Sequence, residues 1–506
     1  MSSKPQIIIY WGRRDFRLND NQALFEGINS HTQNQIPFFP VYILDDNFIK
    51  NPGLNVGYYR RYFLARILGQ YSHKFDNYSI FTGKPDAIFN ELGKHFRIDL
   101  YFNDELEPYA KNRDQKVAEI IEQNGGRVYK FRDQSSINLN VLTQTGNIYS
   151  VYTPFKNAVI EDFLASKVVP KVDLNNINYK LGSEIDLSTT SGLNFLKLEK
   201  TVNARYQQIF DYIDAPDVLT LPNGIAIDIS SLCPRQDISS YWYFDEDQAL
   251  EKLDQFLEKD ILNYKVYRDD LALDAELDGK TSRISPALKW GLVSARTVIT
   301  QILFRYPKEQ IYADSNLLSY VNELIWREFY RYILVHNPKV LDLEFQPKYQ
   351  NTIKWIQGDE AVNRFKLWVA GQTGYPVVDA AMNQIAKIGW MHNRSRMIVA
   401  SILTKNLGID WRWGQAYFRF MLTDLDEASN NGGWQWAASV GSDPKPIRIF
   451  NPYLQAQNYD KNEKYQQKWL PGDYNFLEPP IVEHKLARDQ ALVRYGLVSK
   501  STVKDY

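Results

Sequence analysis

Residues 6–20 read QIIIYWGRRDFRLND, a short apolar run that leads directly into a charged loop. An apolar run of this length, without alternating polar residues, is typical of a strand that is buried on both faces of a parallel sheet. Runs of the same character recur with helical patterns between them, at 38–45, 78–83, 98–103 and 126–131. This alternation predicts a doubly wound, Rossmann-like parallel sheet in an α/β domain over residues 1–134.

The loop after the first run limits what this domain binds. It reads GRRDFRLND instead of G-x-G-x-x-G, the pattern that lets a strand–helix turn approach a dinucleotide pyrophosphate. A standard NAD-binding domain is therefore not favoured.

The rest of the chain has a different character. Residues 135–215 are less regular and rich in Asn, Ser and Thr, and we predict that they connect two domains. Over 216–506, most clearly after 245, apolar residues recur with the 3.6-residue period of helices. We expect a large all-α domain there, since 506 residues exceed what one ordinary core holds.

Composition excludes several classes of protein. The hydrophobic fraction of 44% and the charged fraction of 24% are those of a globular protein, and no apolar stretch approaches the ~20 residues of a membrane span. The single cysteine, Cys233, excludes an intrachain disulfide framework. The N-terminus lacks the apolar region of a signal peptide, so a cytoplasmic location is expected. No H-E-x-x-H, P-loop or G-x-S-x-G pattern is present, and no metal site is predicted.

The charge of the chain is balanced overall but not locally. A net charge of −1 does not favour an indiscriminate nucleic-acid binder. Residues 387–412, however, contain one acid, Asp410, and five basic residues: Lys387, Arg394, Arg396, Lys405 and Arg412. This excess suits a phosphate-binding face, while the commoner explanation for such a cluster is a solvated helix surface.

The segment TSRISPALKWG, 281–291, has the features of a helix start. Ser285 is suited to be the N-cap and Pro286 the first helical residue. Thr281, Ser282 and Arg283 precede them, and hydroxyls with a guanidinium beside a helix N-terminus suit a phosphate or pyrophosphate. An ordinary capped surface helix is the alternative.

Tryptophans occur in pairs in the second half of the chain. Trp411 and Trp413 stand two residues apart, as do Trp434 and Trp436 in NNGGWQWAAS. At about 100° per residue, two such side chains face nearly opposite sides of a helix. A single Trp usually fills a core, but this series beside a phosphate-binding segment suggests two different sites.

Charged residues near these tryptophans also alternate in direction. Arg394 and Arg396 are about 200° apart on one helix, so they should face different partners. Asp424 and Asp426 likewise point apart. We expect a buried Arg396–Asp424 ion pair, for which a purely structural role is the commoner case.

Taken together, the segments resemble the photolyase/cryptochrome family, and most closely the class I cyclobutane pyrimidine dimer (CPD) DNA photolyases. The segments that carry the resemblance are RRDFRLNDNQAL, YTPFKNA, GKTSRIS, NELIWREFY, GQTGYPVVDAAM, GWMHNRSRM, NNGGWQWAAS, RIFNP and PIVEHK. They follow the family's order over nearly the full length. The resemblance implies an α/β domain, a connection and a helical FAD-binding domain. It also implies a carbon–carbon lyase that splits dimers in UV-damaged DNA, by light-driven electron transfer from reduced FAD to a flipped-out lesion.

The resemblance further assigns roles to residues. FAD would be held by Tyr264, Thr281, Ser282, Arg283, Ile284, Ser285, Arg396, Asp424, Asp426 and Asn430. Asn430 would lie at flavin N5, and the glycines that follow it would permit close approach. Trp434, Trp411 and a distal Trp355 would carry electrons, although WIQGDEAVNRFKLW is longer between its two Trp than the family pattern. The lesion would contact Glu323, Trp326, Asn393, Met397 and Trp436, with Glu323 stabilising a radical anion when protonated. DNA would contact Arg268, Arg327, Arg394 and Gln455.

A second chromophore and several alternatives complete these expectations. An antenna pigment, methenyltetrahydrofolate or deazaflavin, is expected between the domains, near Asn103, Asp104, Glu105 and Glu107. The protein is expected to be a monomer with no membrane partner. The main alternative is a blue-light photoreceptor cryptochrome, against which Asn430 and Trp436 speak. A (6-4) photolyase would carry His-His where this chain has His392-Asn393, and a non-photochemical flavin oxidoreductase would need a nicotinamide site.

Overall fold

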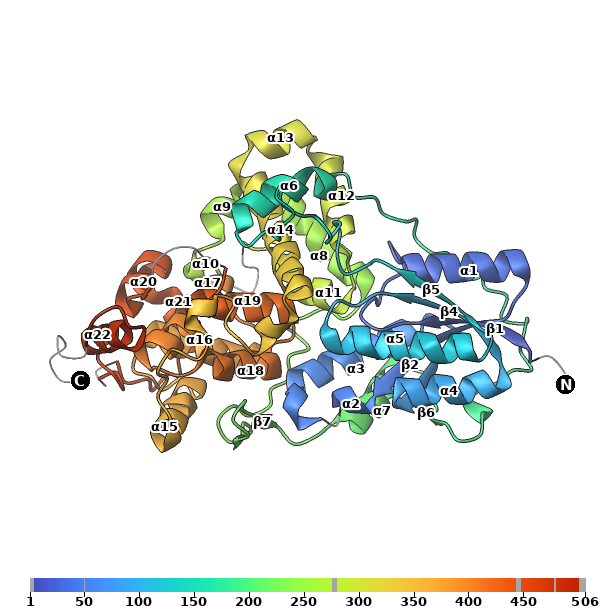
Figure 1. Cartoon of the computed structure of the whole chain (residues 1–506), viewed down its shortest axis with the longest axis horizontal. Helices are drawn as coiled ribbons and strands as arrows, with labels where there is room; N and C mark the ends of the chain where they lie inside the picture. The colour runs from blue at the N-terminus through green and yellow to red at the C-terminus, as the bar shows by residue number, and fades with distance from the viewer. Residues whose placement is uncertain (1–3, 50, 275–279, 443–446, 477–478, 500–506) are drawn as a thin grey trace.

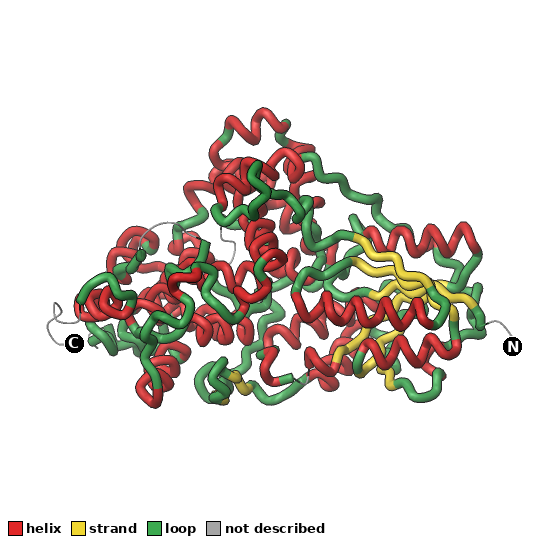
Figure 2. Tube along the Cα trace, viewed as in Figure 1, coloured by secondary structure: helices red, strands yellow, loops and turns green. Residues whose placement is uncertain are grey.

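A computed structural model describes residues 4–49, 51–274, 280–442, 447–476 and 479–499. A sheet with flanking helices forms one half, on the right of Figure 1, and an array of helices forms the other (Figure 2). The predicted α/β plus all-α architecture is confirmed. No helix within the described ranges is both long and apolar enough to cross a bilayer.

Six strands form the sheet, in the order β5-β4-β1-β2-β3-β6. The first five pair in parallel, and β6 is antiparallel to β3. Their bounds are β1 Gln6–Trp11, β2 Phe38–Asp45, β3 Ser79–Gly83, β4 Arg97–Asn103, β5 Arg127–Phe131 and β6 Asn194–Leu196. The five predicted strands thus appear within one residue of their expected positions.

Both faces of this sheet are covered, which explains the unbroken apolar runs. Ile8 packs toward α1 (Gln22–Asn34) and α3 (Tyr58–Ser72). Ile7 and Ile9 face the other way, toward α4 (Pro85–His95) and α5 (Pro108–Gln123). All three isoleucines are fully buried, as expected for the central strand of a doubly wound sheet.

The stretch 135–215 contributes to both halves. Helix α6 (Tyr152–Leu164) packs on the helical domain beside α14. Strand β6 then extends the sheet, and α7 (Val202–Ile213) packs on α3. The boundaries at 134 and 215 remain predictions.

Helices of the second half surround the candidate site. The long α14 (Ser315–His336), α17 (Asn393–Ser401), α18 (Trp411–Met421) and α19 (Glu427–Ala437) carry most of the residues of interest. A Cβ at Gly432 would overlap the ring of Tyr330, so this glycine lets α19 approach α14. In this structure, the close approach that Gly432 permits is between α19 and α14.

Shorter elements surround and connect these helices. The other helices are α2 Asp46–Ile49, α8 Glu246–Lys259, α9 Tyr264–Tyr267, α10 Leu271–Asp274, α11 Ser285–Trp290, α12 Ala295–Arg305, α13 Lys308–Ala313, α15 Gly358–Val369, α16 Pro376–Ile388, a π-helix Ile402–Asn406, α20 Pro452–Tyr459, α21 Lys464–Trp469 and α22 His484–Arg494. A small hairpin pairs β7 Val218–Thr220 with β8 Ala226–Asp228. Short 3₁₀ turns are Pro52–Leu54, Leu174–Asn176, Leu187–Thr189, Ile261–Asn263, Pro338–Leu341, Pro347–Tyr349 and Lys461–Glu463.

Candidate functional site

Trp390 marks the place where two predicted cofactor segments meet. Its indole N–H donates to Ser285 Oγ at 3.2 Å. The guanidinium of Arg283 lies 5.1 Å from the Trp390 ring centroid, and that of Arg396 lies 5.9 Å from it. The TSRIS segment and α17, more than 100 residues apart in sequence, therefore belong to one site.

The start of α11 differs from the prediction by one residue. The helix begins at Ser285, and the N-cap position is Ile284, which has no capping side chain. Ser285 is not the N-cap, because its hydroxyl is positioned to accept the Trp390 hydrogen bond instead. Arg283 adopts φ of +46°, which is unfavourable for any residue other than glycine. Such strained backbone conformations cluster at functional sites. Ser282 and Arg283 are buried, so this segment is no ordinary surface cap.

The expected Arg396–Asp424 ion pair is present. The Arg396 guanidinium donates to Asp424 Oδ2 at 2.8 Å, and its Nε donates to the Met391 carbonyl at 2.8 Å. The other carboxylate oxygen, Asp424 Oδ1, is buried and has no hydrogen-bond partner among the described residues.

Two further polar atoms on α19 lack partners in the same way. Asn430 donates from Nδ2 to the Gln415 carbonyl at 3.1 Å, which leaves its Oδ1 buried and unbonded within the described chain. The indole N–H of Trp434 is likewise buried without a described partner. An unsatisfied buried polar atom costs about 1–3 kcal/mol. Asp424, Asn430 and Trp434 therefore fit a bound group with both donors and acceptors, as FAD has.

Asp426 lies in a different environment from Asp424. It caps α19 by accepting from Ser429 N at 3.0 Å, and it pairs with Arg331 at 2.8 Å. Burial alone would raise the pKa of Asp426, but Arg331 and the nearby Arg327 outweigh it and hold this pKa well below its usual range. Arg331 also donates to the Gln134 carbonyl, so this carboxylate is tied to the last residue of the predicted α/β domain.

A second group of residues forms a charged rim where α9, α14 and α17 approach each other. Arg268 pairs with Glu323 and donates to Ser319 Oγ at 3.3 Å. Arg394 pairs with Asp269 at 2.9 Å. Partial burial raises the pKa of Glu323, and the Arg268 guanidinium opposes this rise. We call Arg268, Asp269, Glu323 and Arg394 the charged rim.

The rim has an aromatic wall, made of the predicted Trp326 and a second ring that the sequence analysis did not select. The Trp326 ring stacks on Tyr152 with centroids 3.6 Å apart and an interplanar angle of 5°. Tyr152 is thereby a candidate site residue, and its place in the segment YTPFKNA was its only signal. Tyr264 lies beneath Arg268, whose guanidinium is 5.6 Å from its ring.

The paired tryptophans do face different surroundings. Trp434 is buried against Phe418, with centroids 5.0 Å apart. Trp436 is half-buried, 6.3 Å from Phe450 and beneath the guanidinium of Arg448. Three further predicted residues, Asn393, Met397 and Gln455, are exposed or half-buried, on α17 and α20.

Two of the predicted electron-transfer residues, Trp411 and Trp434, lie at α18. A Cβ at Gly414 would overlap the Trp434 ring, so this ring lies against α18 one turn from Trp411. Trp411 is fully buried. Trp355 is half-buried and meets Tyr495 edge-on at 6.0 Å. Trp368, which sequence reasoning did not select, also lies 6.1 Å from Trp434.

Two predictions lose support from the structure. Arg327 turns inward, toward the Leu288 carbonyl at 3.5 Å and toward Asp426, which argues against a DNA contact. The basic run 387–412 is also no single face. Lys405 is buried and donates to the Ala437 carbonyl, while Arg396 and Arg412 pair with carboxylates. Successive helical residues point in different directions, so a linear cluster does not define a surface patch.

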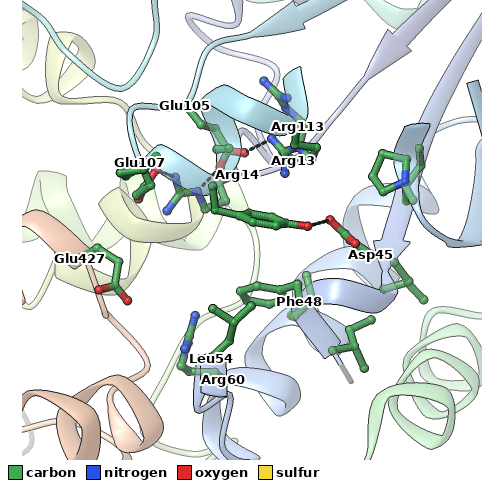
Figure 3. A pocket seen from close by; sticks show the side chains of 18 of the residues that line it. Arg13, Arg14, Asp45, Phe48, Leu54, Arg60, Glu105, Glu107, Arg113 and Glu427 are labelled. Carbon is green, nitrogen blue, oxygen red and sulfur yellow. Dashed lines mark hydrogen bonds and ion pairs between the residues drawn. The ribbon is translucent and has the colours of Figure 1, made fainter. Parts of the chain in front are cut away.

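A cavity of about 310 Å³ lies between the two domains (Figure 3). Arg14 pairs there with Glu105 and Glu107, and Glu427 comes from the helical side. Burial, with help from Arg14 and Arg60, lowers the pKa of the lining residue Lys289 to about 7. Of the four residues expected here, Glu105 and Glu107 line the cavity. Asn103 instead bonds Asp15, and Asp104 accepts from the Asp133 amide.

Comparison with known proteins agrees with this geometry. Residues 8–173 match a family model described as DNA photolyase, and residues 320–500 match one described as the FAD binding domain of DNA photolyase. A class III photolyase from Agrobacterium tumefaciens has a similar structure, with a TM-score of 0.75 and 29% identity over 99% of both chains. A Sulfolobus tokodaii photolyase, described as containing two FAD molecules, matches with a TM-score of 0.70 over 97% of this chain and 100% of its own, and at 24% identity shows the fold alone.

One curated relative decides the family. The deoxyribodipyrimidine photo-lyase of Synechococcus sp. is 32% identical over 517 residues, which cover 97% of this chain and 96% of its own. With both halves of the chain matched as well, the protein belongs to the photolyase/cryptochrome family.

Proposed function

We propose that this protein repairs cyclobutane pyrimidine dimers in DNA with light, using FAD bound in the helical domain. One observation carries the proposal: Asp424, Asn430 and Trp434 present buried polar atoms that lack partners within the described chain, beside the Arg396–Asp424 pair. Such atoms are costly unless a ligand satisfies them.

The residues that would hold FAD divide by chemistry. Thr281, Ser282 and Arg283 suit the phosphates, since hydroxyls and a guanidinium are their natural donors. Asn430 and the Arg396–Asp424 pair suit the polar edge of the isoalloxazine. When bound and reduced, FAD supplies the photoexcited electron that splits the dimer.

The charged rim suits a flipped-out lesion. A crosslinked pyrimidine pair stacks poorly in duplex DNA, so extruding it costs less than extruding normal bases. Trp326, braced by Tyr152, offers an aromatic wall that replaces part of the lost stacking. Arg268 is free to exchange Glu323 for a backbone phosphate, because their ion pair is open to water. Glu323 would then face the base edges.

The residues of α17 favour CPDs over (6-4) photoproducts. Reversing a (6-4) adduct requires a proton donor, for which a histidine is suited. Asn393 is exposed but carries no such proton. His392 is buried, and its ring nitrogen accepts from the Arg394 amide at 3.2 Å. The imidazole is therefore engaged as the N-cap of α17.

Two accessory functions belong to the same proposal. Trp434, Trp411 and Trp355 would carry electrons to the cofactor and keep it reduced. The interdomain cavity would hold an antenna pigment, methenyltetrahydrofolate or a deazaflavin, whose acidic groups suit Arg14 and Lys289. We expect the protein to act as a monomer in the cytoplasm.

The test uses defined oligonucleotides that each carry one lesion. Reduced protein should remove CPDs under blue light and not in darkness, and should leave (6-4) lesions intact. Repair in darkness, or efficient repair of the (6-4) substrate, would contradict the proposal.

A further inference from the structure

Glu344 is a buried carboxylate that no part of the proposed function uses. It lies between two short turns and only 2% of its side chain is exposed. Its Oε1 accepts a hydrogen bond from the indole N–H of Trp411 at 3.3 Å. Its Oε2 is buried without a hydrogen-bond partner among the described residues.

The position of this carboxylate is fixed from α19. Gln435, the residue after Trp434, accepts from the Phe345 amide at 2.7 Å. The same side chain donates to the carbonyls of Val340 and Leu343, at 2.8 and 3.1 Å. The segment that carries Glu344 is therefore fastened on both sides of it to the helix that carries Trp434.

Arg412 places a positive charge beside the same indole. Arg412 pairs with Glu344 Oε1 at 2.8 Å, and its guanidinium lies 4.9 Å from the centroid of the Trp411 ring. Asp410 pairs with the same guanidinium at 2.8 Å but makes no described bond to the indole. Arg412 thus serves two carboxylates, of which one contacts Trp411.

We propose that Glu344 is a positioning residue of the electron-transfer chain, which stabilises Trp411 while the indole is oxidised. This inference rests on the proposed route through Trp411. In that route Trp411 gives one electron to oxidised Trp434 and later receives one from the distal donor, so its ring carries a positive charge in between. The indole proton stays on nitrogen throughout.

The physical reason is electrostatic. A positive charge on the fully buried Trp411 ring has no water to solvate it, and Arg412 repels it. The Glu344 carboxylate opposes that repulsion at hydrogen-bond distance. The N–H···O bond also strengthens once the ring is charged, because its donor is then ionised.

The decisive variant is Glu344→Gln, which keeps a hydrogen-bond acceptor and removes the charge. Light-driven reduction of the oxidised holoenzyme under external reductant should slow by about tenfold. Repair by chemically reduced enzyme should stay unchanged. In darkness, the indole N–H resonance of Trp411 should shift, a readout that requires no turnover.

One matched variant separates this role from simple packing. Asp410→Asn removes one charge from the same Arg412, without touching the indole, and should change the rate of reduction by less than about twofold. If Asp410→Asn slows reduction as much as Glu344→Gln does, the cluster acts by packing and the inference fails.

A last control distinguishes this inference from the proposed route. If Trp411→Phe blocks photoreduction while Glu344→Gln reduces at the wild-type rate, the route stands and the role of Glu344 is refuted. If Trp411→Phe itself reduces normally, the route is wrong and the inference falls with it.

Discussion

Two arginine–carboxylate pairs of the helical domain, Arg268–Glu323 and Arg396–Asp424, differ most in the exposure of their carboxylates. The two arginines are similar, with 22% and 26% of their side chains exposed, whereas Glu323 keeps 30% and Asp424 keeps 2%. Water solvates the charges of an open pair while partners exchange, so exchange costs little. A buried carboxylate that loses its arginine costs several kcal/mol. The Arg268–Glu323 pair of the rim can thus exchange partners at little cost, whereas Asp424 in the interior cannot.

The largest predicted effect distinguishes electron transfer in the interior from lesion binding at the rim. Trp411→Phe should abolish light-driven reduction of oxidised FAD, because the interior route is interrupted. It should leave CPD repair by chemically reduced enzyme nearly intact, since the rim is untouched. Flavin absorbance during illumination measures the first, and dimer counts in irradiated oligonucleotides the second.

The control for this variant lies two residues away. Trp413 faces Phe365, with centroids 5.5 Å apart. The FAD of Trp413→Phe should be photoreduced as in the wild type. A block of photoreduction in this variant would show that electrons pass through Trp413.

The next effect tests the closed pair. Arg396→Ala leaves Asp424 buried and unpaired, which should cost about 3–5 kcal/mol of unfolding free energy and weaken retention of FAD. Denaturant titration and the flavin content of purified protein measure the two quantities.

Arg364→Ala provides the comparison for this variant. Arg364 pairs with Glu360 one turn away, and the Glu360 side chain is 61% exposed. We expect its loss to cost less than about 1 kcal/mol. Equal costs for both variants would remove the distinction between closed and open pairs.

A smaller effect concerns the open pair. Arg268→Ala should reduce the affinity for CPD-containing duplex by about tenfold, and it should make the log–log salt slope shallower by about 0.9, the contribution of one phosphate contact. Arg327→Ala should leave the slope unchanged, because Arg327 turns inward. Binding isotherms at several salt concentrations decide the matter, and a change of slope in the Arg327 variant would restore the DNA contact predicted from sequence.

The smallest effect depends on pH. The pKa of Lys289 is lowered to about 7 in the folded protein, against 10.5 in an unfolded chain. Between these values the unfolded chain binds more protons, so Lys289 makes stability rise with pH. The free-energy cost of burying the charged form of Lys289 is fully present below pH 7. Lys289→Met should therefore flatten the rise by about 1 kcal/mol per pH unit just above pH 7. Parallel pH profiles in both proteins would show that Lys289 titrates normally.

Short sequence patterns predicted the features that depend on residues close together in the chain. The five parallel strands were found because strands buried on both faces need unbroken apolar runs. Trp434 and Trp436 were placed in different surroundings by helical geometry alone. The Arg396–Asp424 pair followed from residue directions together with the family resemblance.

Contacts between distant segments were not predicted. Tyr152 stacks on Trp326 across 174 positions of sequence, and no periodicity announces such a partner. The position of Ser285 was wrong by one residue because Trp390, from another segment, occupies its hydroxyl. The basic run 387–412 failed as a patch because Arg396, Lys405 and Arg412 each find their own partner in three dimensions.

The connection formed by 135–215 also has an optical consequence. Its helix α6 lies against α14, while β6 is hydrogen-bonded into the sheet, so the connection is anchored in both domains. Excitation energy passes between chromophores with a steep dependence on distance and angle. For a pigment seated between the domains, both quantities would depend on how these two anchors hold the domains together.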